Sequence, residues 1–157
     1  MSVDTLVSHV KSLATDEGRV VGTHGHEEAK NYILSQLSTT KLRPHTGNSF
    51  EIPYEMEGAV FTNIVGILEG RNKELPSILL GAHYDTIYDT PGADDNAAAV
   101  SILLEIAREL KPHRLEHSVI FCIFDAEEPP NFLQPSMGSI RYYFDQRKSG
   151  IHCALIM

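Results

Sequence analysis

The stretch that decides the fold reads ILLGAHYD, residues 78–85. Its first five residues are apolar without alternation, and the same is true of VIFCIF, residues 119–124. Continuously apolar strands are buried on both faces, as in the middle of a sheet that helices cover. Residues 96–110, between the two strands, carry apolar side chains at helical spacing. The three segments therefore predict a β-α-β unit.

The flanking segments extend this unit into a sandwich. Apolar residues at helical spacing predict helices at 3–14, 27–37 and 139–147, and residues 49–56 and 59–69 predict two strands of a hairpin. The apolar run at 151–157 predicts a third central strand. We therefore expect an α/β fold, a three-layer α/β/α sandwich with a mixed, largely parallel central sheet.

Composition narrows the class of protein. A length of 157 residues with 42% hydrophobic and 22% charged residues predicts a single domain spanning residues 1–157. The net charge of −8 argues against nucleic acid and anionic membrane surfaces as partners. No apolar run approaches the ~18 residues of a membrane span. The N-terminus shows no signal peptide, so we expect a cytoplasmic protein. Cys122 and Cys153 form no CxxC motif and predict neither a disulfide framework nor a thiolate zinc site.

Polar residues collect where the buried strands end. One histidine and up to six carboxylates lie there: His83, Asp85, Asp94, Asp95, Asp125, Glu127 and Glu128. The carboxyl ends of such strands form the ligand-binding edge of an open α/β sheet. Converging carboxylates repel one another and resist ionisation unless a cation lies between them. A mixed set of histidine and carboxylate ligands suits zinc, with cobalt or manganese as substitutes.

The spacing of these residues suggests separate roles. His83 and Asp85 are two apart on an extended strand and face the same side, so Asp85 can accept a hydrogen bond from the histidine ring. Asp95 lies with Asp94 at the expected start of a helix, where unpaired N–H groups favour carboxylates. Glu127 and Glu128 are adjacent and diverge, so one can bind a metal while the other takes a proton from water.

Each signal also has a plain structural interpretation. Asp94, Asp95 and Asn96 can cap a helix, and the Glu127–Glu128 pair can be solvated charges on a loop. The pair His24 and His26 is explained by a polar loop and a helix start, since the sequence shows no acids near it at metal spacing. The combination at the strand ends favours a metal centre.

Together these segments resemble the co-catalytic dizinc aminopeptidase family, which includes bacterial leucyl aminopeptidases and glutamate carboxypeptidase-like enzymes. The matching stretches are GAHYD (81–85), PGADDNA (91–97), AEE (126–128) and MGS (137–139), with GTHG (22–25) similar to an upstream family segment. The resemblance implies a zinc-exopeptidase-like fold, two zinc ions, and a peptide substrate with a free N-terminus.

The resemblance also implies site residues. His83 would bind one zinc, Glu128 the other, and Asp95 would bridge them. Glu127 would be the general base, and Asp85 the catalytic partner of His83. The reaction would be hydrolysis of the N-terminal residue from a peptide.

Two departures from the family pattern qualify these expectations. The loop at 129–137 is longer and richer in proline than in many members, and it either reshapes the substrate pocket or is a surface lid. The family takes two further zinc ligands from beyond the position of Met157. We therefore expect a domain incomplete at its C-terminus, weak or partial zinc occupancy, and a chain that is inactive alone.

Two alternative functions remain open from the sequence. One is a glutaminyl cyclase-like enzyme with a single zinc, although the run Asp94-Asp95-Asn96 favours the peptidase. Another is a truncated, non-catalytic binding module. An unpaired sheet edge near residues 152–157 would also favour a homo-oligomer.

Overall fold

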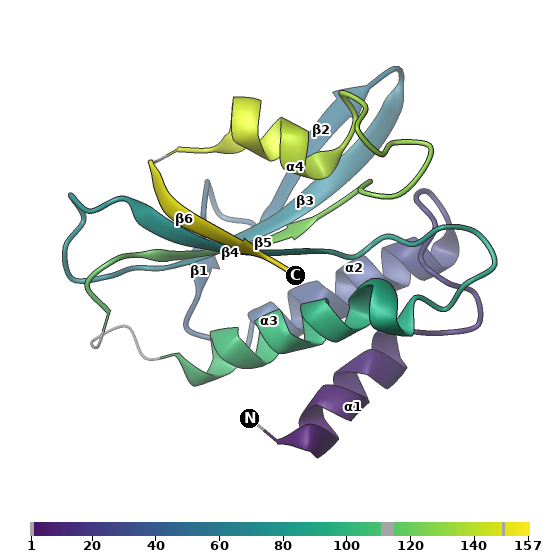
Figure 1. The fold of residues 1–157 in the computed structure, drawn as a ribbon, viewed down its shortest axis with the longest axis horizontal. Coiled ribbons are helices and arrows are strands. Elements are labelled where there is room, and N and C mark those ends of the chain that lie inside the picture. Colours follow the sequence, from purple (N-terminus) through teal and green to yellow (C-terminus); the bar gives the residue numbers. More distant parts are fainter. Residues whose placement is uncertain (1, 111–114, 149) are drawn as a thin grey trace.

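The computed structural model describes residues 2–110, 115–148 and 150–157, which form a sheet with helices on both faces (Figure 1). Helices α1 (Val3–Leu13), α2 (His24–Leu37) and α3 (Ala98–Glu109) lie on one face, and α4 (Gly138–Arg141) lies on the other. The strands are β1 (Arg43–Pro44), β2 (Glu51–Met56), β3 (Ala59–Leu68), β4 (Ser77–His83), β5 (Val119–Phe124) and β6 (Ile151–Ile156). The expected three-layer α/β/α arrangement is confirmed.

The sheet is mixed, with the strand order β1-β3-β5-β4-β6 and β2 also paired with β3. Strand β4 runs parallel to β5 and β6, whereas β3 is antiparallel to β1, β2 and β5. The expectation of a largely parallel sheet is therefore wrong for the described strands. The reason is that β3, which forms a hairpin with β2, runs antiparallel to each of its strand neighbours, including the central strand β5.

Strand β6 does not occupy the central position that its apolar sequence predicts. Within the described residues it pairs with β4 alone. Leu155 and Ile156 are 58% and 60% exposed. One edge of β6 thus has no strand partner among these residues.

Two apolar layers hold the sandwich together. On the face of α1–α3, a cluster that includes Ile33, Leu103 and Ile123 is almost fully buried. On the α4 face, a smaller cluster includes Cys122 and Phe124. Successive residues of β5 serve opposite faces, as the period of a strand requires. All six β5 residues are buried, which confirms the prediction of a strand covered on both sides. None of the described helices is long and apolar enough to span a membrane.

Several element bounds differ from expectation. Helix α2 begins at His24 rather than residue 27, because the Thr23 hydroxyl accepts a hydrogen bond from the His26 N–H and caps the helix. The predicted helix at 139–147 is divided into α4 and a π-helical turn, Tyr142–Gln146. Strand β1 was not predicted, because two residues are too few to show a strand pattern.

The connections that follow β4 and β5 leave the sheet on opposite faces. The chain after β4 leads to α3, and the chain after β5 leads to α4 (Figure 1). Two neighbouring parallel strands with divergent connections leave a crevice at their carboxyl ends, where ligands bind in open α/β sheets. We therefore expect the ligand crevice at the carboxyl ends of these strands, where His83, the last residue of β4, is the register partner of Phe124, the last residue of β5.

Candidate active site

Three of the predicted site residues converge at this crevice from three separate segments. His83 ends β4, Asp95 lies in an irregular turn (Ala93–Ala97) before α3, and Glu128 follows β5. One ligand atom from each lies within 4.8 Å of the others. His83 Nε2 is 3.0 Å from Asp95 Oδ1. The structure therefore brings together all the residues that the sequence analysis expects to bind metal.

Asp85 lies behind this trio and is fully buried. Its Oδ1 and Oδ2 accept hydrogen bonds from the backbone N–H groups of Glu127 (3.0 Å) and Glu128 (2.9 Å). Its Oδ1 is also 3.4 Å from His83 Nδ1, which is an ion-pair distance rather than a well-formed hydrogen bond. Asp85 thus links the end of β4 to the loop after β5, a contact that the sequence analysis did not foresee.

Glu127 and Glu128 diverge, as their adjacency predicts. Both carboxylate oxygens of Glu127 accept hydrogen bonds from Ser139, one from its N–H (2.6 Å) and one from its hydroxyl (3.0 Å). Burial raises the pKa of Glu127, and the bonds from Ser139 offset this only in part. Glu127 is therefore a half-buried carboxyl held by two hydrogen bonds, and its raised pKa suits a general base.

The charges around His83 favour a cation. Burial lowers the pKa of His83, but the carboxylates of Asp85, Asp95 and Glu128 outweigh burial and raise it above its usual value. Burial, followed by the charge of Asp95, raises the pKa of Glu128. The carboxylates thus repel one another at close range. Nδ1 of His83 is buried without a hydrogen-bond partner in the described part of the chain. One imidazole nitrogen and two carboxylates form a donor set that suits zinc.

Asp94 and Asp95 do not cap a regular helix, contrary to expectation. The backbone of Asp95 and Asn96 is non-helical, the peptide bond between them is cis, and α3 begins at Ala98. Asp95 turns toward His83, with its Oδ1 3.0 Å from His83 Nε2. A cavity of about 330 Å³ adjoins this segment and is lined in part by Ile87, Asp94, Asp95 and Glu128.

Asp125 does not join the other carboxylates. It is fully buried, and its Oδ1 pairs with His26 Nε2 at 2.8 Å while its Oδ2 accepts a hydrogen bond from the Thr62 N–H. The His26 ring stacks on Tyr84 with centroids 4.8 Å apart. Asp125 points to the α2 face. The expectation that up to six carboxylates converge at the strand ends is therefore wrong for this residue. The sequence analysis explained His26 only as part of a helix start.

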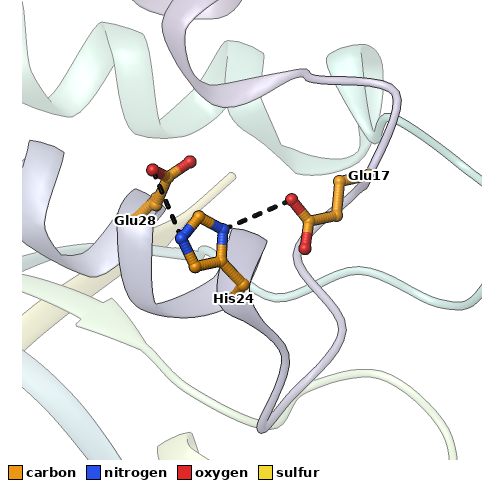
Figure 2. A group of neighbouring side chains, drawn as sticks. All are labelled: Glu17, His24 and Glu28. Atoms are coloured by element: carbon orange, nitrogen blue, oxygen red, sulfur yellow. Dashed lines mark ion pairs between the residues drawn. The ribbon is translucent and has the colours of Figure 1, made fainter.

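His24 lies between two acids, Glu17 and Glu28, at the protein surface (Figure 2). Its Nδ1 is 3.5 Å from Glu17, in the loop before α2, and its Nε2 is 3.6 Å from Glu28, one turn along the helix. The expectation that no acids lie near the histidine pair is therefore wrong. Each ring nitrogen faces a different carboxylate, all three side chains are exposed, and their ligand atoms lie within 4.8 Å of one another.

The proline-rich loop at 129–137 packs on the β2–β3 hairpin. The Tyr54 hydroxyl donates a hydrogen bond to the Ser136 carbonyl (2.9 Å), and the Ser136 hydroxyl bonds Asn131 within the loop. Residues of the loop and of the hairpin together line a cavity of about 300 Å³. The loop and the hairpin are therefore in contact, and the loop directly follows the segment that carries Glu127.

Sequence comparison identifies relatives of this chain. It is 41% identical over 120 residues to human endoplasmic reticulum metallopeptidase 1, covering 72% of this chain and 13% of the relative. It is 42% identical over 103 residues to aminopeptidase YwaD of Bacillus subtilis, covering 65% of this chain and 20% of the relative. The chain therefore spans only a small part of the curated relatives that it matches.

Solved structures share the fold over nearly the whole chain. The glutaminyl cyclase of Porphyromonas gingivalis superposes with a TM-score of 0.75 at 22% identity, covering 99% of this chain and 60% of that one. A zinc-dependent exopeptidase from Parabacteroides distasonis gives a TM-score of 0.72 at 21% identity, covering 99% and 60%. At these identities the likeness shows the zinc-exopeptidase-like fold alone. Residues 63–155, more than half of the chain, match the sequence profile of Peptidase family M28, and the chain belongs to that family.

Proposed function

We propose that this chain carries the metal centre of a zinc-dependent aminopeptidase, which hydrolyses the N-terminal residue from peptides. The observation that carries the proposal is the convergence of His83, Asp95 and Glu128 beside a separately held Glu127. Membership of a peptidase family and the sequence likeness to aminopeptidase YwaD support the substrate class.

His83, Asp95 and Glu128 would hold the zinc. Catalytic zinc sites usually have three protein ligands, so these residues suffice for one ion. The two ions that the resemblance implies would require ligands beyond these three. When bound, zinc supplies a Lewis acid that polarises the peptide carbonyl and lowers the pKa of water. With only three ligands, we expect binding to be weaker than in a site with a complete dizinc ligand set.

The protein's own residues would move the proton. Glu127 would accept a proton from the attacking water as its oxygen bonds to the carbonyl carbon. It would then give that proton to the amine that leaves when the C–N bond breaks. Asp85 would position the loop, since it binds the backbone N–H groups of both Glu127 and Glu128. The acidic lining of the adjoining cavity would attract the α-ammonium group of the substrate.

A glutaminyl cyclase-like activity is the second candidate, favoured by the structural likeness to the P. gingivalis enzyme over 99% of the chain. That likeness concerns the fold alone, at 22% sequence identity, whereas the relative with 42% sequence identity is an aminopeptidase. The two activities differ in their products. The peptidase releases a free amino acid, and the cyclase converts an N-terminal glutamine into a ring with loss of ammonia.

Zinc titration against a competing chelator tests the metal centre. His24→Ala is a matched control, because His24 also lies between two glutamates but outside the crevice. We expect His83→Ala to weaken zinc binding at least tenfold and His24→Ala to leave it unchanged. Equal losses in the two variants, or no binding by the wild type, would refute the proposed centre.

Activity assays on the protein then decide the reaction. In a longer form of the protein that supplies the further zinc ligands, we expect zinc-dependent release of N-terminal residues, with Glu127→Gln lowering kcat by about 10²–10⁴ while zinc remains bound. Cyclisation of N-terminal glutamine without peptide hydrolysis would establish the alternative activity. Bound zinc with neither activity would indicate a non-catalytic binding module.

A further inference from the structure

Arg19 is a buried cation outside the group of residues discussed so far. It lies in the loop between α1 and α2, and only 1% of its surface is exposed. Its guanidinium donates four hydrogen bonds, all to backbone carbonyls. Nε bonds Tyr84 (2.6 Å), Nη1 bonds Leu13 (2.9 Å) and Pro91 (2.7 Å), and Nη2 bonds Gly92 (2.9 Å).

Three of these four acceptors belong to the segments that carry His83 and Asp95, and the fourth, Leu13, ends α1. Tyr84 is the residue between His83 and Asp85, and Pro91 and Gly92 come directly before the turn that holds Asp95. The Arg19 backbone adds two further bonds on the β4 side. Its N–H donates to the Thr86 hydroxyl (2.8 Å), and its carbonyl accepts from the Thr86 N–H (3.1 Å). One residue therefore binds both segments.

Burying the charged guanidinium of Arg19 costs free energy. Burying a charged group is unfavourable unless polar partners replace its water. Burial lowers the pKa of Arg19 to about 10, and the charges of Asp85 and Asp95 oppose this decrease. Gly92 has a φ of +60° and lies so close that a Cβ atom would be 2.7 Å from Arg19 Nη2. The absence of a side chain at Gly92 permits the close approach of the guanidinium.

We propose that Arg19 is a positioning residue that holds the end of β4 and the segment at 91–95 at the separation that brings His83 and Asp95 together. The proposal rests on the proposed function only for the identity of the ion that the two side chains would bind. The planar guanidinium is suited to this task because its donors have fixed directions. A lysine at this position has three donors on one atom and cannot reproduce the fork.

A general contribution to stability is the competing explanation, and metal-free protein distinguishes the two. Amide hydrogen exchange would be measured in the wild type, Arg19→Met, Arg19→Lys and a control, Leu103→Ala. Leu103 is a core residue of α3 that is 1% exposed, so its truncation destabilises the fold without touching the arginine.

We expect Arg19→Met to accelerate exchange at least tenfold at residues 84–97, which include the hydrogen-bonded amides of Thr86 and Ala97, and to leave β2 and β3 unchanged. Arg19→Lys should give an intermediate acceleration at the same residues. Leu103→Ala should accelerate exchange across the core. Unchanged protection at 84–97 in Arg19→Met, or acceleration spread as in Leu103→Ala, would refute the positioning role.

Zinc affinity provides the second measurement, at a temperature where all variants are folded by circular dichroism. Arg19→Met should weaken zinc binding at least tenfold, Arg19→Lys less, and Leu103→Ala not at all. Equal weakening in Arg19→Met and Leu103→Ala would refute the proposal. If the wild type binds no zinc, the proposed function fails, while local acceleration in Arg19→Met still supports the positioning of these segments.

Discussion

Both carboxylate oxygens of Glu127 are bound by one residue, Ser139, through its N–H at 2.6 Å and its hydroxyl at 3.0 Å. Ser139 lies at the start of α4, so the first turn of that helix sets the direction of the carboxylate. Glu128 instead turns toward His83 and Asp95. The contacts with Ser139 make Glu127 the candidate base, and the proximity to His83 and Asp95 makes Glu128 the candidate ligand.

The first prediction concerns the Ser139 hydroxyl. Ser139→Ala removes one of the two hydrogen bonds to Glu127 and keeps the backbone bond, so the carboxylate becomes less firmly oriented. We expect kcat of the proposed reaction to fall about tenfold, with KM and zinc affinity unchanged. Steady-state kinetics would measure this. Ser136→Ala is the control, since its hydroxyl bonds Asn131 in the neighbouring loop, and an equal effect in both variants would contradict the prediction.

The second prediction concerns Gly138, which lies against β3 and β5. A Cβ atom there would collide with the Asp125 carbonyl and with Asn63 Oδ1. Because a backbone atom cannot give way easily, we expect Gly138→Ala to lower the free energy of unfolding by about 1–3 kcal/mol, as measured by urea denaturation. Gly150→Ala is the control, because its added Cβ would meet only Pro76, at 3.7 Å. Similar losses in the two variants would show that the close approach at Gly138 has no energetic consequence.

The third prediction concerns the pH dependence of stability. Hydrogen bonds from Arg108 lower the pKa of Glu105 below its ordinary value of 4.5, and His9 adds to this effect. Since folding favours the ionised form, the stabilisation is present above pH 4.5 and is lost as the pH falls through the folded-state pKa. We expect Glu105→Gln to lower Tm by a few degrees at pH 7 and by much less at pH 3.

Thermal denaturation across this pH range would measure the effect of Glu105→Gln. Glu74→Gln, at an exposed position, should show no difference at either pH. A loss in Glu105→Gln that is as large at pH 3 as at pH 7 would mean that packing, and not charge, accounts for it.

The fourth prediction concerns the free edge of β6. An unpaired edge strand with exposed apolar side chains is a template for another strand. We expect the 157-residue chain to form dimers or larger species, and Leu155→Lys to reduce them, as measured by light scattering. Val3→Lys is the control, since Val3 is also an exposed apolar residue but lies on α1. A wild-type chain that is monomeric at all concentrations would contradict the prediction.

Much of the fold could be predicted because its signals are local. The runs at 78–82 and 119–124 are long enough to identify buried strands, and polar residues follow both directly. The hairpin was predicted too, but not that β3 lies antiparallel to β5, since strand order depends on pairing between distant segments. The non-helical backbone at Asp95 was also missed, because an Asp-Asp-Asn run is typical of an ordinary helix cap.

The sequence by itself located one histidine and several carboxylates at one edge of a sheet, and the family resemblance selected His83, Asp95 and Glu128 among them as the expected metal ligands. Only the tertiary structure decided how these residues are held. Asp125 turns to His26, 99 positions away in the chain, and Arg19 binds the carbonyl of Tyr84, 65 positions away. Backbone carbonyls occur at every residue, so no sequence pattern marks the ones that a buried arginine will bind. The chemistry of the site follows from residue identity, and its geometry follows from contacts that only folding brings together.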